Sequence, residues 1–215
     1  MNTPLVKTYI QVREQILKNI VKMITYRGLL NKDNLDDNIK KITSKHPDDL
    51  IYNLELNDKS IYKIKFFNQV VTTIKKPVEI VNFLDNTPQG MLVVQDIKQT
   101  AHNKIYKSYP NIEVFSENEL MINLIGKNIV PDEFYKIIDS KDKDYETKIN
   151  EFLKDYNTKI IKKIPLIKEF DPMAKYLFCK PGDIIKIIRY SSASLKSPYY
   201  RLVIKSTINI NTKNI

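Results

Sequence analysis

Several residue types are scarce in this sequence of 215 residues, which has no tryptophan, one cysteine, two histidines and four glycines. The single cysteine, Cys179, excludes an internal disulfide. With only two histidines beside it, the chain cannot build a structural zinc site from Cys and His ligands. No Gly-rich phosphate-binding loop is present. Cys179 stands among apolar neighbours, so we expect a buried, inert thiol.

Long apolar runs are also missing from the sequence. No segment is long enough to cross a bilayer, and the opening residues MNTPLVKTYIQ lack the hydrophobic block of a signal peptide. These absences predict an intracellular, soluble protein without a membrane partner. The hydrophobic content of 42% is enough for a real core, and the length suggests one or two domains.

The net charge of +10 is concentrated near the C-terminus. Residues 1–155 hold 23 basic and 22 acidic side chains, whereas residues 156–205 hold 11 basic and 3 acidic ones. A polyanion or an acidic protein surface is the natural complement of such a region. The alternative is a solvated lysine face, because a chain rich in Lys, Ile and Asn also reflects A/T-rich codons.

The first 125 residues show the alternating pattern of an α/β protein. Asn57–Ser60 separates two extended runs, which predicts a β-hairpin. Pro4 suits the first turn of a helix, and Gly28 offers a left-handed stop for it. The remaining periodicities predict helices over 4–27, 33–43, 75–86 and 100–109 and strands over 90–95 and 112–115. This order predicts a mixed-sheet α/β domain.

A second domain is expected beyond a boundary near 126–128. The segment VPDEFYKIID predicts a short helix from Pro131, and residues 143–155 predict another. Asp171 and Pro172 are a typical cap and first residue of a short helix.

Turn residues at Lys180–Asp183 precede the expected sheet of this second domain. We expect antiparallel strands at 184–188 and 199–205, joined through 191–198. Lys186 then points away from its apolar neighbours, while Arg189 and Arg201 lie near the loop ends of the strands. The result is a small α+β unit with basic groups on its sheet.

One pattern resembles nuclease chemistry. Asp85 precedes a buried strand that ends in Asp96-Ile97-Lys98. Two carboxylates and a lysine in that order can hold Mg²⁺ and activate water. The alternative is a strand end with solvated polar residues, since Asp-x-Lys is a short pattern in a chain full of both residues.

A second pattern suits phosphate contact. Thr100, His102 and Lys104 begin the helix that follows Lys98. Backbone N–H groups at a helix start, together with the two lysines, can meet a phosphate. A capped surface helix is the alternative interpretation.

The C-terminal segment IPLIKEFDPMAKYLFCKPGDIIKIIRYSSASLKSPYYRLV, residues 164–203, resembles a known family. It is similar to the assembly domain of the fifth subunit shared by eukaryotic nuclear RNA polymerases, a subunit that has an archaeal counterpart. The similarity is ungapped and depends on Pro165, Asp171, Pro172, Ala174, Tyr176, Lys180, Gly182, Lys186, Ile187, Ile188, Arg189, Ser191, Tyr200 and Arg201. Upstream, Val130 and Pro131 match a Val-Pro pair of the family.

The resemblance implies a non-catalytic subunit of a DNA-directed RNA polymerase with no cofactor, metal or small-molecule substrate. It implies a jaw domain with a nuclease-like fold over 1–125, an assembly domain over 126–207 and a tail over 208–215. Expected partners are the largest polymerase subunit, other polymerase subunits and downstream duplex DNA. The residues expected near DNA are Lys98, Thr100, His102 and Lys104. Those expected to dock on the largest subunit are Asp171, Pro172, Tyr176, Gly182, Lys186, Arg189, Tyr200 and Arg201.

Some positions depart from the family pattern. Phe178 stands where the family has a glycine, Pro181 replaces a basic residue, and Ser191-Ser192-Ala193 replaces Ser-Glu-Thr. Such drift, with the A/T-rich composition, indicates a polymerase of a large DNA virus. The expected location is the nucleus for a cellular protein and a cytoplasmic viral factory or the virion for a viral one. A Mg²⁺-dependent nuclease and a free-standing basic nucleic-acid-binding module are the alternatives.

Overall fold

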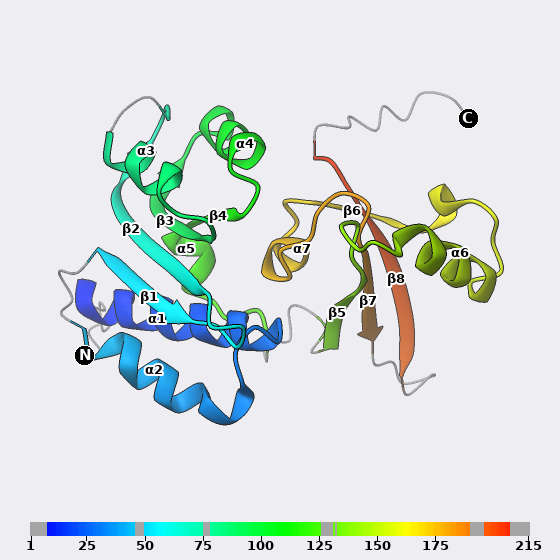
Figure 1. Ribbon diagram of the computed structural model, residues 1–215, viewed down its shortest axis with the longest axis horizontal. Helices are drawn as coiled ribbons and strands as arrows, with labels where there is room; N and C mark the ends of the chain where they lie inside the picture. The colour runs from blue at the N-terminus through cyan, green and yellow to red at the C-terminus, as the bar shows by residue number, and fades with distance from the viewer. Residues whose placement is uncertain are drawn as a thin grey trace, which may run out of the picture. The chain divides into compact units, whose positions relative to one another are not determined.

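The computed structural model describes residues 8–45, 50–74, 78–125, 131, 133–189 and 196–206. The chain divides into two compact units, residues 1–123 and 124–215, and each is considered by itself (Figure 1). Both combine helices with a mixed sheet, which confirms the predicted α+β class. No helix within the described ranges is long and apolar enough to span a membrane.

The N-terminal unit is built on a sheet with the strand order β1-β2-β3-β4. Strand β1 pairs antiparallel with β2, whereas β2, β3 and β4 run parallel. Figure 1 shows α1 and α2 on one side of this sheet and α3 and α4 on the other. The elements are α1 (Tyr9–Tyr26), η1 (Lys32–Asn34), α2 (Leu35–Thr43), β1 (Ile51–Glu55), β2 (Ile61–Val71), α3 (Val78–Asp85), β3 (Gly90–Ile97), α4 (Gln99–Ser108), β4 (Ile112–Ser116) and α5 (Glu117–Leu120).

Local sequence signals explain most of these boundaries. Thr8 and Gln11 form a capping box at the start of α1, and Gly28 ends the helix with φ +78°. The predicted start at Pro4 lies outside the described residues. The hairpin turn closes where the Leu56 N–H donates to the Ser60 carbonyl at 2.9 Å. The predicted hairpin and central strand are therefore confirmed.

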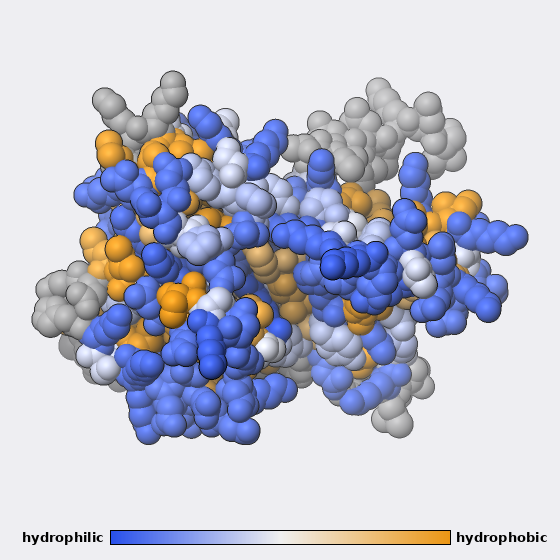
Figure 2. All heavy atoms as spheres, in the orientation of Figure 1, coloured by the Kyte–Doolittle hydropathy of each residue, from blue (hydrophilic) through white to orange (hydrophobic). Residues whose placement is uncertain are grey.

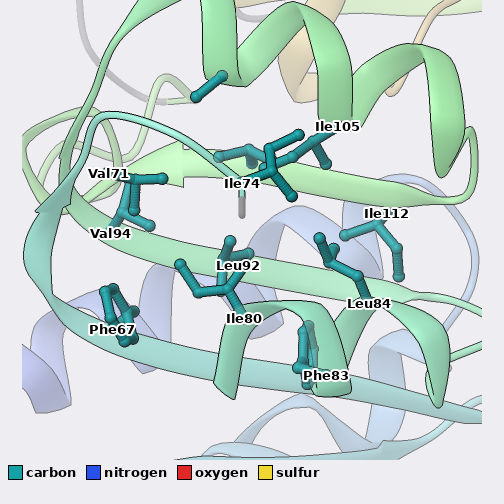
Figure 3. Close-up of a cluster of buried hydrophobic side chains, with 12 residues drawn as sticks. Phe67, Val71, Ile74, Ile80, Phe83, Leu84, Leu92, Val94, Ile105 and Ile112 are labelled. Atoms are coloured by element: carbon teal, nitrogen blue, oxygen red, sulfur yellow. The ribbon is translucent and has the colours of Figure 1, made fainter. Parts of the chain in front are cut away.

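The core of this unit lies on both faces of β3, because successive side chains of a strand point to opposite faces. Leu92 and Val94 point into a cluster that is closed by Ile80 and Leu84 of α3 and Ile105 of α4 (Figure 3). All of these side chains are buried, so the apolar runs predicted as strands are the walls of a real core.

A buried polar network lies on the other face of the sheet. Arg27, just after α1, makes a two-pronged ion pair with Glu113 of β4, with distances of 2.6 and 2.8 Å. The Tyr62 hydroxyl of β2 donates to the same carboxylate at 2.6 Å. Burial and the neighbouring Glu113 charge raise the pKa of Tyr62 well above its ordinary value. These contacts tie the end of α1 to two strands.

The C-terminal unit has a sheet with the strand order β5-β7-β8-β6, in which only the β6–β8 pair is parallel among the described strands. In Figure 1, α6 lies on one side of this sheet and α7 on the other. The elements are β5 (Glu133–Ile138), α6 (Tyr145–Asp155), η2 (Ile161–Lys163), β6 (Leu166–Lys168), α7 (Pro172–Tyr176), β7 (Ile184–Arg189) and β8 (Ser197–Ile204).

The helix predicted from Pro131 is wrong, because Glu133–Ile138 forms strand β5. Phe134 is buried opposite Ile187 of β7, while the next residue, Tyr135, is exposed. This alternation and the aromatic and β-branched residues favour a strand over the helix that a proline with acidic neighbours suggested. Asp132 and the predicted boundary at 126–128 lie outside the described residues.

Candidate functional site

The register of β7 and β8 sorts the residues expected to dock on a partner onto two faces of one sheet. Lys186 lies opposite Tyr200, and Ile185 lies opposite Arg201. Because facing residues share a side and neighbours alternate, Lys186 and Tyr200 belong to one face. Arg189 and Arg201 belong to the other.

On the first face, Tyr200 is part of the packing beneath α6. Its ring centroid lies 5.1 Å from that of Phe152 and 5.7 Å from that of Tyr156. Ile184, Leu202 and Ile149 of the same layer are buried. Tyr200 therefore holds α6 to the sheet, and half-buried Lys186 lies beside it.

On the second face, α7 covers the sheet. Tyr176 is buried at 6% exposure, and its ring lies 5.7 Å from that of Phe134. It supports α7 from inside and offers little surface to a partner. Asp171 and Pro172 begin the helix as predicted, since the Asp171 carboxylate accepts from the Met173 N–H at 2.9 Å. Cys179 is buried, which confirms that part of the expectation for its thiol.

The buried carboxylate of Asp183 stabilises the turn at Lys180–Asp183. Asp183 is fully buried and accepts from the Ser140 N–H at 2.7 Å and the Lys180 N–H at 2.8 Å. Lys136 pairs with it at 3.1 Å. Burial acts to lower the pKa of Lys136, but its hydrogen bond to Asp139 and the Asp183 charge outweigh that effect and raise the pKa.

Gly182 is the residue of this turn with a positive φ, +100°. A Cβ there would lie 3.1 Å from Ser140 Cβ, and the Gly182 carbonyl accepts from the Tyr145 hydroxyl at 3.0 Å. Its role is therefore to set the backbone that leads into β7.

Arg189 and Arg201 share a pocket of about 470 Å³ with Asp171. The arginine at 201 lies opposite Ile185, in the middle of β8, so its predicted place near the loop end is wrong. Its guanidinium donates to the Leu166 carbonyl at 3.2 Å, and Arg189 lies over the Tyr199 ring at 5.0 Å. Within the described residues, no carboxylate forms an ion pair with either arginine. The pocket is lined by Leu166, Ile167, Lys168, Phe170, Asp171, Met173, Ile187, Arg189, Arg201 and Ser206.

The residues expected near DNA lie between the N-cap and the middle of α4, the helix that follows β3. Lys98 is the N-cap, without a side-chain capping bond, and its carbonyl accepts from the His102 N–H at 3.0 Å. Lys98, Thr100 and Lys104 are exposed, whereas His102 is half-buried. Thr100 and Lys104 are four residues apart and share one side of the helix.

The two carboxylates of the nuclease alternative lie at opposite ends of β3. Asp85 accepts from the Tyr109 hydroxyl at 2.6 Å, and the Tyr109 carbonyl accepts from Ile112, which pairs with Gly90. Asp85 is therefore at the Gly90 end of the strand, while Asp96–Lys98 follows its other end. Six residues of strand, about 20 Å, separate them, so they do not form one site. In the part of the chain that the structure describes, no three His, Cys, Asp or Glu side chains gather as metal ligands.

Comparison with known proteins shows what the C-terminal unit is similar to. Residues 143–203, from α6 to β8, match the model of the RNA polymerase Rpb5 C-terminal domain. The chain is also 26% identical to DNA-directed RNA polymerase subunit 5 of Acanthamoeba polyphaga mimivirus, over 88% of this chain and 90% of that protein. Residues 143–203 are therefore similar to the Rpb5 C-terminal domain, and the chain is Rpb5-like. This confirms the resemblance of residues 164–203, and the mimivirus relative supports a divergent viral member.

Two cellular relatives match the Rpb5-like chain over a shorter stretch. The RPABC1 subunits of DNA-directed RNA polymerases I, II and III from Caenorhabditis elegans and Caenorhabditis briggsae are each 30% identical over 122 residues. That stretch covers 55% of this chain and 54% of each relative. All three relatives are named as subunits of DNA-directed RNA polymerases.

Sequence reasoning missed two parts of the Rpb5-like site. Strand β6 closes one side of the arginine pocket, but its three residues, Leu166–Lys168, are too short to show a periodic signal. The apolar lining was also missed, because Phe170 comes from the turn after β6, Met173 from α7 and Ile187 from β7.

Proposed function

We propose that this Rpb5-like chain docks through its C-terminal unit on the largest polymerase subunit and holds its N-terminal unit as part of the lower jaw near downstream DNA. The jaw domain corresponds to residues 1–125, the assembly domain to 126–207 and the tail to 208–215. The site of action is the nucleus in a cellular host, or a viral factory or the virion for a virus.

The observation that carries this proposal is the pocket of Arg189 and Arg201. Two arginines lie together on a sheet face with no ion-pair partner among the described residues, inside the segment that matches the Rpb5 family. Arginine forks are suited to charge-assisted contacts with a protein surface. A polymerase subunit with acidic groups at this position would supply the missing partner.

The experiment is affinity purification of the tagged chain, followed by mass spectrometry. We expect the large polymerase subunits to co-purify with the natural chain. Arg189→Glu and Arg201→Glu should each reduce their recovery by about tenfold or more, since a reversed charge repels the partner's acidic group. Lys154→Glu is the matched control, because Lys154 is exposed on α6, which packs on the opposite face of the sheet.

Normal assembly of both arginine variants would show that this face does not dock. Recovery of DNA without any polymerase subunit would instead favour the free-standing nucleic-acid-binding module.

A further inference from the structure

The pocket of Arg189 and Arg201 has an unbalanced charge. Its lining includes three cationic side chains, Lys168, Arg189 and Arg201, and one carboxylate, Asp171. That carboxylate already accepts the Met173 N–H at the start of α7. The cationic groups therefore lack an equal anionic complement within the lining.

Each arginine is held in place while most of its donors stay available. Arg201 donates one N–H to the Leu166 carbonyl at 3.2 Å, out of the five N–H groups that a guanidinium carries. Arg189 is oriented by the Tyr199 ring, which is 46% exposed. A side chain that is already oriented loses less conformational freedom when it binds a carboxylate.

The rest of the lining is apolar. Phe170, Met173 and Ile187 contribute to it, together with Leu166 and Ile167 of β6. Protein–DNA interfaces are more polar and more positive than this, because phosphates are met by polar side chains and backbone N–H groups. An apolar wall beside two arginines suits a peptide that carries an acidic side chain next to an apolar one.

We propose that this pocket takes an aspartate or glutamate side chain, with an apolar neighbour, from an extended segment of the polymerase subunit on which the chain docks. The inference rests on the proposed function and names the partner's chemistry. The carboxylate accepts hydrogen bonds from Arg189 and Arg201, while its apolar neighbour packs on Met173 and the exposed Leu166.

The decisive experiment is site-specific photo-crosslinking in the assembled polymerase. A photoactivatable amino acid replaces Met173, which lines the pocket, and in a matched control it replaces the exposed Lys154 of α6. We expect position 173 to crosslink to a peptide of a polymerase subunit that has an aspartate or glutamate at or beside the attachment point. Position 154 should not crosslink to that peptide.

A double-mutant cycle then tests the contact itself. Arg189→Gln, Arg201→Gln and the acid-to-amide change in the crosslinked partner should each weaken binding about tenfold or more, and each pair should weaken it by less than the product of its single effects. Lys154→Gln is the control for loss of one positive charge.

The outcomes separate this inference from the proposed function. If the polymerase co-purifies but position 173 crosslinks to nucleic acid, to a segment without acidic residues, or to nothing, only this inference fails. If the losses of binding free energy from the arginine and acid changes are additive, this inference also fails, but the proposed function does not. If the natural chain does not co-purify with any polymerase subunit, both fail.

Discussion

At the scale of single residues, three helices end in the same backbone arrangement with three different residues at its left-handed position. Gly28 follows α1, Asn157 follows α6 and Phe178 follows α7, with φ of +78°, +53° and +51°. In the last case the Phe178 N–H donates to the Lys175 carbonyl and the Cys179 N–H to that of Ala174, which is the Schellman motif. Only Phe178 is a bulky side chain in this position, so it carries backbone strain.

Because of this strain, we expect glycine at position 178 to give a more stable protein than alanine, although alanine is the better residue in a helix. Phe178→Gly and Phe178→Ala both remove the ring that lies near Lys180, 4.2 Å from its Nζ. They differ in the cost of the left-handed backbone, so the glycine variant should be about 1 kcal/mol more stable than the alanine variant. Urea denaturation, with hydrogen exchange of α7 to identify the C-terminal transition, measures the difference.

Gly28→Ala is the matched control for this comparison, since a Cβ at position 28 would meet nothing within 4 Å. It should cost about 1 kcal/mol from the backbone alone. An alanine variant at 178 that is as stable as the glycine variant would show that the strain is absent.

Tyr62 gives the N-terminal unit a specific response to alkaline pH. Its pKa is raised above the ordinary value of 10.0 because burial and Glu113 disfavour the phenolate. Its contribution to stability is complete below pH 10, where the folded and unfolded chains both keep the proton. It decreases as the pH rises toward the folded pKa, because only the unfolded chain then releases the proton.

Tyr62→Phe is therefore expected to reduce stability more near neutral pH than at alkaline pH. At about pH 8 the variant should be about 2 kcal/mol less stable, because it lacks the hydrogen bond to Glu113. Above pH 10 the gap should narrow, since the phenylalanine has no proton to lose. Urea denaturation of both proteins across this range is the measurement, and a constant gap would contradict the assigned pKa direction.

At the scale of helices and strands, segments with strong apolar periodicity were predicted correctly. The wrongly predicted segment, β5, lacks such a signal. The helix of 143–155 and the strands at 184–188 and 199–205 have regular apolar spacing, and all three exist with shifted ends. Strand β5 was mistaken for a helix because Pro131 and Glu133 resemble a helix start. Its strand state depends on pairing with β7, a contact between residues more than forty positions apart.

Helix α6 should depend on one aromatic side chain of the sheet beneath it. Tyr200 contacts Phe152 and Tyr156 through ring edges. Tyr200→Ala should lower the free energy of unfolding of the C-terminal unit by about 3 kcal/mol and speed hydrogen exchange throughout α6. Mass spectrometry of exchanging peptides would show both the site and the size of the effect.

Tyr200→Phe keeps the rings in contact and is the appropriate control for this experiment. It should leave the exchange of α6 unchanged, since the Tyr200 hydroxyl makes no hydrogen bond within the described residues. Unchanged exchange in the alanine variant would mean that Tyr200 faces a partner instead.

At the scale of the whole molecule, charge and motif indicated where the site lies but not how it is arranged. The excess of basic residues over 156–205 and the family pattern of 164–203 both indicated the C-terminal unit. The eight expected docking residues are nevertheless divided among two sheet faces, the start of α7, the turn before β7 and an interior position. Alternation along a strand places neighbouring residues on opposite sides of the sheet. The register of β7 against β8 decides which residues lie opposite one another, and one sequence does not show that register.

The N-terminal unit should add sequence-independent DNA contacts to the assembled polymerase. Lys98, the N-cap of α4, and Lys104, in the middle of that helix, are both exposed. The Lys98→Ala/Lys104→Ala double variant should weaken binding to downstream duplex equally for different sequences. It should also reduce the slope of log affinity against log salt by about 1 for each lysine. Fluorescence anisotropy between about 50 and 200 mM salt measures this slope.

Removing two other exposed lysines of the same unit controls for net charge. Lys22 is on α1 and Lys40 on α2, and both helices lie on the side of the sheet away from α4. Lys22→Ala/Lys40→Ala should leave the slope unchanged. Equal decreases in the slope for the two double variants would show that α4 is not part of the DNA-contacting surface.

On the face that Figure 2 shows, hydrophilic residues cover most of the surface and hydrophobic ones occur in separate groups.

The place of β8 in its sheet has a consequence for biosynthesis. It is the last of the described strands to be translated, yet it pairs with both β7 and β6 and completes the arginine pocket. A ribosome-bound chain can finish its N-terminal unit early, as domains generally fold in the order of their synthesis. The half that would meet the polymerase stays incomplete until β8 has emerged from the ribosome. Incorporation should therefore follow translation, and nascent chains halted before β8 would not be recruited.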